Sequence, residues 1–252
     1  MLRIGLLGCG NIGHIIAQHA KGFAISAVFD TVPARADEIA AICHGTAFTD
    51  AEAFLNADVD LIVEAASVGA ARAHAKEVLL HNKNLVIMSV GALTDPAFKE
   101  ELMETARARN KKIYIPSGAI FGLDNLKIGQ ISPITKLLLK TTKSPKSLGL
   151  TATSRKLVFS GKAHECIKAY PKNVNVSVAM SLAAGQDTDV ELWVDPAVDK
   201  NVHELFIEGS FGETYIKVTN LPSPDNPATS YLAALSILSL LKNLDSPLVV
   251  GT

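Results

Sequence analysis

A glycine motif at the start of the chain constrains the fold more than any other feature of the sequence. The apolar residues 3–7 predict a short strand, and residues 8–13, Gly-Cys-Gly-Asn-Ile-Gly, follow it directly and precede a helical pattern. A G-x-G-x-x-G motif between a strand and a helix is typical of dinucleotide-binding domains. Its glycines allow a tight turn, let a pyrophosphate approach the backbone, and let the helix lie against the strand. The alternative is a glycine-rich turn that serves only the fold.

An acidic residue strengthens the dinucleotide interpretation. Asp30 ends the second predicted strand, where a carboxylate can accept hydrogen bonds from the hydroxyls of an adenosine ribose. The same carboxylate repels a 2′-phosphate, so the sequence favours NAD over NADP. Arg35 could reach back to a 2′-phosphate and permit NADP, or it could be an ordinary exposed helix residue. The predicted cofactor contacts in this region are Gly8, Gly10, Asn11, Ile12, Gly13 and Asp30.

Two further loops are candidates for the nicotinamide end of the cofactor. Residues 65–67 follow the fourth predicted strand, residues 89–92 follow the fifth, and open α/β sheets bind ligands beyond the carboxyl ends of their strands. Small residues there let a flat nicotinamide ribose pass, although ordinary turns use small residues as well. The predicted contacts are Ala65, Ala66, Ser89 and Val90.

The order of the predicted elements indicates an α/β protein with two domains. In the first half six predicted strands alternate with helices, which implies a parallel sheet covered on both faces, the doubly wound Rossmann architecture. After Pro116 several predicted strands follow one another across turns, which favours a second, α+β domain on an open, mostly antiparallel sheet. The predicted dinucleotide-binding domain is residues 1–117, joined by the C-terminal helix within 228–252. Residues 118–227 are predicted to serve catalysis, substrate binding and dimerisation.

The sequence patterns also set boundaries for each element. In the first half the predicted strands are residues 3–7, 24–30, 46–48, 61–64, 84–89 and 112–115, and the predicted helices are residues 11–21, 33–43, 51–55, 70–81 and 96–110. In the second half the predicted strands are residues 137–142, 156–159, 190–194, 205–208 and 214–218, and the predicted helices are residues 163–169, 174–183 and 229–243.

Composition argues against several classes of protein. Lys and Arg number 24 and Asp and Glu 25, so the formal net charge is −1 and nucleic acid is not an expected partner. Three widely spaced cysteines and no histidine pair at metal-ligand spacing predict neither a disulfide framework nor a metal site. The chain shows neither a signal peptide nor the roughly 18 apolar residues of a membrane span, which predicts a soluble, cytoplasmic protein with no membrane partner. With 48% hydrophobic and 19% charged residues, it is expected to bury surface against a second copy.

Four segments resemble the L-aspartate dehydrogenase family. They are residues 117–124 (Ser-Gly-Ala-Ile-Phe-Gly-Leu-Asp), 170–176 (Tyr-Pro-Lys-Asn-Val-Asn-Val), 201–204 (Asn-Val-His-Glu) and 226–235 (Asn-Pro-Ala-Thr-Ser-Tyr-Leu-Ala-Ala-Leu). The resemblance extends from the glycine motif to the last helix. It implies a homodimeric, NAD(P)-dependent enzyme that oxidises L-aspartate to iminosuccinate. Iminosuccinate then hydrolyses to oxaloacetate and ammonia, or feeds quinolinate and so NAD biosynthesis.

The resemblance also implies roles for single residues. The family's catalytic histidine falls on His203, and its nicotinamide contacts fall on Ala119 and Asn175. From the residues alone, His164 in a polar helix is expected to be solvated, whereas His203 heads an apolar strand and could be either functional or structural. Both substrate carboxylates need cationic or hydroxyl donors, because an unpaired carboxylate in a closed site is costly. The predicted donors are Ser117, Thr142, Lys143 and Lys172, although either lysine could instead be an exposed surface residue.

A mechanism follows from the chemistry of histidine. With an ordinary pKa near 6.5, His203 can accept a proton from the substrate ammonium or from the water that attacks the imine. Activity is then expected to fall below a pH of about 6 to 7. Two other functions stay open: a related two-domain Rossmann oxidoreductase acting on another small carboxylic acid, and a dinucleotide-sensing protein without turnover. The lysines and His203 argue against the second of these.

Overall fold

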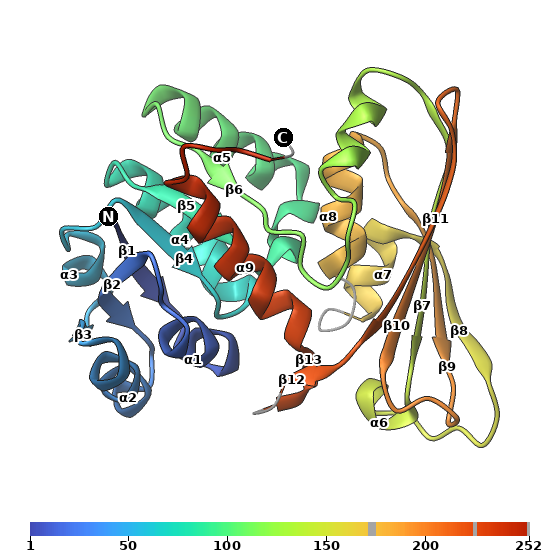
Figure 1. The fold of residues 1–252 in the computed structure, drawn as a ribbon, viewed down its shortest axis with the longest axis horizontal. Coiled ribbons are helices and arrows are strands. Elements are labelled where there is room, and N and C mark those ends of the chain that lie inside the picture. Colours follow the sequence, from blue (N-terminus) through green and yellow to red (C-terminus); the bar gives the residue numbers. More distant parts are fainter. Residues whose placement is uncertain (171–174, 224–225, 251–252) are drawn as a thin grey trace. The chain divides into compact units, whose positions relative to one another are not determined.

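The computed structural model describes residues 1–170, 175–223 and 226–250. The chain forms two compact units. The first contains Met1–Pro116 and Ala234–Val250, and the second contains Ser117–Ala233. In Figure 1 the first unit holds the elements from the blue strand β1 (Leu2–Leu7) to the green strand β6 (Ile113–Tyr114), together with most of the red helix α9 (Tyr231–Leu244). The functions predicted for the two domains remain predictions.

A parallel six-stranded sheet forms the centre of the first unit. Its strand order is β3-β2-β1-β4-β5-β6, and each strand runs parallel to its neighbours. This is the order 3-2-1-4-5-6 of the doubly wound fold, which confirms the Rossmann prediction. The strands are β1 (Leu2–Leu7), β2 (Phe23–Phe29), β3 (Thr46–Phe48), β4 (Leu61–Glu64), β5 (Asn84–Ile87) and β6 (Ile113–Tyr114).

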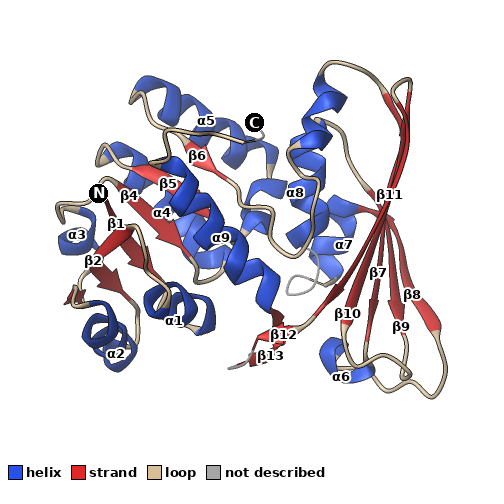
Figure 2. Ribbon diagram, viewed as in Figure 1, coloured by secondary structure: helices blue, strands red, loops and turns tan. Residues whose placement is uncertain are grey.

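Helices cover both faces of this sheet, as Figure 2 shows. Helices α1, α2 and α9 share a core with Ile4 and Leu6 of β1, and Ile237 of α9 is fully buried in it. On the opposite face α3 packs closely, since a Cβ added at Gly5 would lie 3.1 Å from the ring of Phe54. The helices are α1 (Asn11–Gln18), α2 (Pro33–Cys43), α3 (Ala51–Leu55), α4 (Val68–Leu80), the short 3-10 helix η1 (Val90–Thr94), α5 (Pro96–Ala108) and α9 (Tyr231–Leu244).

The second unit is built on a five-stranded sheet in the order β11-β10-β7-β9-β8. Its pairs are antiparallel except for β7 with β9, so the prediction of a mostly antiparallel sheet is confirmed. Its strands are β7 (Ile134–Lys143), β8 (Lys156–Lys162), β9 (Asp189–Val194), β10 (Asn201–Gly209) and β11 (Gly212–Asn220). Its helices are η2 (Asn125–Gln130), α6 (Pro145–Leu148), α7 (Ala163–Ala169) and α8 (Asn175–Ala184).

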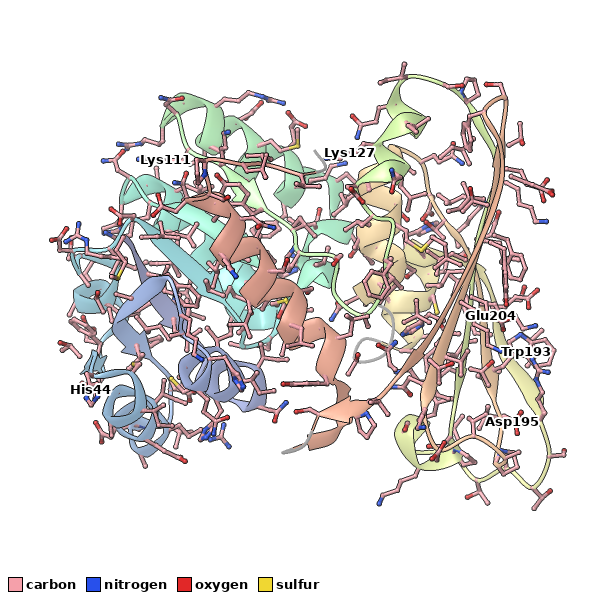
Figure 3. All side chains as sticks on the ribbon, in the orientation of Figure 1. His44, Lys111, Lys127, Trp193, Asp195 and Glu204 are labelled. Atoms are coloured by element: carbon pink, nitrogen blue, oxygen red, sulfur yellow. The ribbon has the colours of Figure 1, made fainter. Side chains whose placement is uncertain are left out.

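The two faces of the second sheet differ in polarity. Alternate residues such as Leu139, Leu192 and Leu205 are fully buried on the face toward α7 and α8. On the other face Figure 3 labels Trp193 and Glu204, whose side chains point away from those helices. Because successive strand residues point to opposite faces, the register places every second residue of β7 and β10 on the buried face.

Several predicted boundaries were wrong. Helix α1 ends at Gln18 rather than at residue 21, and Gly22, with φ +90°, turns the chain before β2. The last helix begins at Tyr231 rather than at residue 229, because Asn226–Ser230 forms strand β13 and pairs with β12 (Pro222–Ser223). Prolines cannot donate to a ladder, so the proline-rich sequence did not suggest this short pair. The predicted start of the 174–183 helix lies outside the described residues.

Candidate functional site

The glycine motif forms a tight turn between β1 and α1. Gly8 has φ +103°, a conformation that L side chains rarely adopt. A Cβ at Gly13 would lie 2.4 Å from the carbonyl oxygen of Gly8, so only glycine lets the helix approach the turn this closely. A Cβ at Gly10, in contrast, would meet nothing within 4 Å. The space beside Gly10 is where a pyrophosphate could approach the backbone, as the motif predicts.

The start of α1 is suited to an anion. Gly10 is its N-cap and offers no side-chain cap, and the first turn holds no acidic residue that would offset the positive end of the helix dipole. Asn11 and Ile12, the first two residues of α1, are half-buried. Together with the open face of Gly10, this geometry fits a dinucleotide.

Asp30 is held at the end of β2. One carboxylate oxygen accepts the backbone N–H of Cys9 at 2.9 Å, and the other accepts that of Val32 at 2.9 Å. A carboxylate oxygen has more than one lone pair, so both can still accept ribose hydroxyls. Arg35 is exposed on α2, which agrees with its interpretation as a surface residue. The structure thus brings Asp30 to the same turn as the glycine motif.

The loops after β4 and β5 lie at the same edge of the sheet. Ala65 is half-buried and Ala66 is exposed, whereas Ser89 and Val90 are buried. The loop after β4 lies directly against the glycine turn, since a Cβ at Gly8 would come within 2.7 Å of the Ala66 Cβ. The carboxyl ends of four neighbouring strands therefore carry the predicted cofactor contacts of the first unit.

Sequence reasoning missed Glu64, the last residue of β4. Its side chain is 1% exposed and accepts hydrogen bonds from the backbone of Ala66, Ser67 and Ser89 and from the Ser89 hydroxyl. Burial raises the pKa of the Glu64 carboxyl, and the hydrogen bonds that it accepts oppose this effect. A charged residue ending an otherwise apolar strand was the signal that could have found it.

In the second unit, three polar side chains share the buried face of the sheet. His203 of β10 pairs with Thr141 of β7 in the register, and Lys143 lies two residues further along β7 on the same face. The Nδ1 atom of His203 lies 2.9 Å from the Thr141 hydroxyl oxygen. His203 is 4% exposed and Lys143 6%, so the alternative of Lys143 as a surface residue is wrong.

Burial holds both groups toward their neutral forms. Burial, with a smaller contribution from the Lys143 charge, lowers the pKa of His203 to about 3. Burial lowers the pKa of Lys143 to about 8. The imidazole is therefore neutral through the whole physiological range, and without a bound anion it is a weaker base than an exposed histidine. The expected loss of activity below a pH of about 6 to 7 does not follow from a histidine in this environment.

Thr142 lies on the other side of the same sheet. It pairs with Val202 and Trp193, and the alternation of β7 turns its side chain away from the face that carries His203. Thr141, which sequence reasoning did not select, is the hydroxyl beside the imidazole. Which threonine faces inward depends on the pairing register, and the sequence does not state it.

Other predicted residues of the second unit are placed as follows. The backbone carbonyl oxygen of Ala119 accepts a hydrogen bond from the side-chain NH₂ of Asn220 at 3.0 Å. The side-chain oxygen of Asn220 accepts one from the Ser230 hydroxyl at 2.7 Å. Asn220 and Ser230 are buried, and sequence reasoning missed both. Ser117 and Asn175 are half-buried, Asn175 at the start of α8. Lys172 lies outside the described residues.

His164 has a different environment from His203. Its side chain is 51% exposed and contacts the carboxylate of Asp187 through Nδ1. An exposed imidazole in a surface ion pair agrees with the prediction that His164 is solvated.

The described residues form neither a membrane-spanning helix nor a metal-binding cluster. None of the helices in the described ranges is long and apolar enough to cross a membrane. In the same part of the chain, no group of three or more His, Cys, Asp or Glu side chains is arranged to hold a metal ion.

The fold and the glycine-turn site define the class: a two-domain dehydrogenase with a nicotinamide dinucleotide-binding domain. A family model described as the NAD binding domain of homoserine dehydrogenase matches residues 5–116. A second, described as the C-terminal domain of aspartate dehydrogenase, matches residues 124–244. The chain belongs to the L-aspartate dehydrogenase family.

Relatives support this assignment along the whole chain. An L-aspartate dehydrogenase of Methanospirillum hungatei is 59% identical over 252 residues and covers 100% of both chains. One from Methanothermobacter thermautotrophicus is 40% identical over 256 residues, covering 100% of this chain and 99% of the relative. The crystal structure of aspartate dehydrogenase from Thermotoga maritima superposes with a TM-score of 0.84, at 28% identity and 100% coverage of both chains.

Proposed function

We propose that this protein oxidises L-aspartate to iminosuccinate with NAD(P), and that His203 is its acid–base residue. The observation that carries the proposal is the buried group of His203, Thr141 and Lys143, in a chain 59% identical to a relative named L-aspartate dehydrogenase. The neutral imidazole can accept the proton of the substrate ammonium, and the buried cation beside it can pair with a substrate carboxylate. This pairing supports an enzyme over a dinucleotide sensor.

The cofactor and the chain divide the chemistry between them. When bound, the nicotinamide supplies a hydride acceptor for the Cα–H of the substrate. The amine lone pair forms the C=N bond as that hydride leaves, so the substrate ammonium must first lose a proton. His203 takes this proton, and Thr141 holds the ring through Nδ1, which leaves Nε2 for the substrate. The same Nε2 could instead take a proton from the water that attacks the imine, and both roles stay open.

Lys143 supplies the cation that a dicarboxylate needs. Below a pH of about 8 its ammonium is charged and can pair with one substrate carboxylate. Binding a dianion next to His203 also opposes the repulsion by Lys143, so it raises the pKa of the imidazole toward a useful range for a base. We assign Ser117 and Lys172 as further substrate donors, as the sequence predicts.

The cofactor contacts follow from the edge of the first sheet. We assign the pyrophosphate to Gly8, Gly10 and Gly13 with the start of α1, and the adenosine ribose to Asp30, which favours NAD over NADP. At the nicotinamide end we assign the loops after β4 and β5 of the first unit. We also assign Ala119 and Asn175, the nicotinamide contacts that the family resemblance implies. The product iminosuccinate then feeds NAD biosynthesis or hydrolyses to oxaloacetate and ammonia.

We also propose a cytoplasmic homodimer. Cys9, Cys43 and Cys166 are free, which suits a reducing compartment. The outer face of the second sheet supports the dimer: it carries the ion pair Lys136–Glu208 and the half-exposed Tyr215, a mixture of charge and aromatic surface that a second copy can match. Light scattering behind a sizing column tests this, since a mass near the 26.7 kDa of one chain would contradict it.

A panel of substrates tests the proposed function. NADH absorbance is followed with L-aspartate, L-asparagine and L-malate at equal concentrations. L-Asparagine lacks one carboxylate and leaves donors of the site unpaired, so its kcat/KM should be lower by about 10²-fold or more. Comparable rates with L-asparagine would contradict a dicarboxylate site, and reduction only with L-malate would favour a hydroxy-acid dehydrogenase.

A further inference from the structure

The side-chain carboxylate of Glu64 joins the loop after β4 to the loop after β5. Its Oε1 atom accepts the N–H groups of Ala66 at 2.9 Å and Ser67 at 3.0 Å, in the loop after β4. Its Oε2 atom accepts the N–H of Ser89 at 2.9 Å, and Oε1 accepts the Ser89 hydroxyl at 2.8 Å, in the loop after β5. One carboxylate thus fixes the spacing of both loops.

The ionised carboxylate is the form that these contacts suit. Three of the donors are backbone N–H groups, which cannot accept a hydrogen bond from the O–H of a carboxylic acid. Burying a carboxylate costs desolvation energy, so an apolar residue would be the better choice if this position only filled space. Hydrogen bonds to charged groups offset that cost and rigidify what they join. The position therefore favours a role in loop geometry over one in packing.

The loop that Glu64 holds has little room to move. A Cβ at Gly8 would lie 2.8 Å from the carbonyl carbon of Ala65 and 2.7 Å from the Cβ of Ala66. The loop therefore packs on the backbone of the glycine turn, and a displacement of a few tenths of an ångström alters the edge at which we place the cofactor. The Glu64 carboxylate accepts two N–H groups of this same loop.

We infer that Glu64 is a positioning residue, which holds the loops after β4 and β5 at the spacing that the nicotinamide half of the cofactor requires. The inference rests on the proposed function for the placement of the cofactor. Its structural part, the coupling of two loops through one carboxylate, can be tested without any cofactor.

The first test measures amide hydrogen exchange in the cofactor-free protein. In Glu64→Gln an amide NH₂ replaces one oxygen and faces a backbone donor, so at least one loop N–H loses its acceptor. Exchange at Ala66, Ser67 or Ser89 should rise by about tenfold, the equivalent of one hydrogen bond. Glu104→Gln, an exposed position on α5, is the matched control and should leave these amides unchanged. Unchanged exchange in Glu64→Gln would overturn the inference.

The second test compares NAD with ADP, which lacks the nicotinamide half. In Glu64→Gln the affinity for NAD should fall by about tenfold, and the affinity for ADP should fall by a factor at least threefold smaller. Ser89→Ala removes only one of the four hydrogen bonds and serves if Glu64→Gln fails to fold. Because Ser89 is itself assigned to the cofactor, its readout is amide exchange at Ala66 and Ser67, which should rise by less than in Glu64→Gln. Equal losses for both ligands would overturn a positioning role. A wild type that binds ADP but no NAD would contradict the proposed function, while the exchange result would still decide the role of Glu64.

Discussion

The edge of the first sheet and the face of the second use different parts of the chain for chemistry. At the first, glycines and backbone N–H groups at the strand ends form the surface, and side chains such as Asp30 are fixed by backbone donors. At the second, side chains buried on a sheet face meet across strands, as His203 and Thr141 do. A backbone site depends on local conformation, whereas a side-chain site depends on register. The two should therefore respond differently to substitution.

The side-chain site should give the largest effect. His203→Ala removes the acid–base group, and kcat should fall by about 10² to 10⁴-fold. His164→Ala is the control, because its imidazole is exposed and paired with Asp187, and it should change little. Steady-state NADH formation measures both variants. A dead His164 variant beside an active His203 variant would move the acid–base role to His164.

The backbone site should lose affinity without losing stability. In Gly10→Ala the added Cβ meets nothing within 4 Å, so Tm should stay within about 2 °C of wild type. The methyl group occupies the path of the pyrophosphate, so NAD should bind about tenfold more weakly or worse. Thermal unfolding and an NAD titration measure these two properties. A variant with unchanged NAD affinity would show that the pyrophosphate lies elsewhere.

The charge of Lys143 should appear in a pH profile. Its pKa of about 8 means that the ammonium is mostly charged at pH 7 and mostly neutral at pH 9. The Ki of succinate, which has two carboxylates and no amine, should rise by about tenfold across that interval. Lys143→Arg keeps the positive charge and should flatten the profile. The same slope in both proteins would remove Lys143 from the carboxylate site.

The smallest predicted effect concerns the choice of cofactor. Asp30→Ala removes the acceptor for the ribose hydroxyls, so the affinity for NAD should fall. It also removes the repulsion of a 2′-phosphate, so the preference for NAD over NADP should narrow several-fold. Asp30→Asn separates charge from hydrogen bonding, since it keeps one acceptor oxygen for Cys9 or Val32. Titrating NAD and NADP into wild type and both variants measures these affinities. A wild type that binds NADP tenfold more tightly than NAD would rule out this role for Asp30.

The contrast between the sites explains what could be predicted from the sequence. The glycine motif, Asp30 and the Rossmann strand order are encoded locally, in short spacings and in alternating strands and helices. His203 and Lys143 could be selected only through resemblance to a family, since nothing in their local sequence separates them from structural residues.

Register and burial account for what sequence reasoning missed. Thr141 and His203 are 62 residues apart, and only the pairing of β7 with β10 shows that Thr141 rather than Thr142 faces the imidazole. Glu64 looked like the polar end of a strand, because its partners are backbone N–H groups that no residue type identifies. The pKa of His203 depends on burial and on a nearby lysine, neither of which a sequence states.

A single-turnover experiment tests most directly whether His203 acts on the substrate rather than on the fold or the cofactor. His203→Ala is loaded with saturating NAD and mixed with L-aspartate, and NADH absorbance is followed through the first turnover. We predict full occupancy by NAD, with an affinity within about twofold of wild type, and a first-turnover rate lower by about 10² to 10⁴-fold. A rate that returns to the wild-type value at saturating NAD would contradict the role of His203 as the acid–base residue.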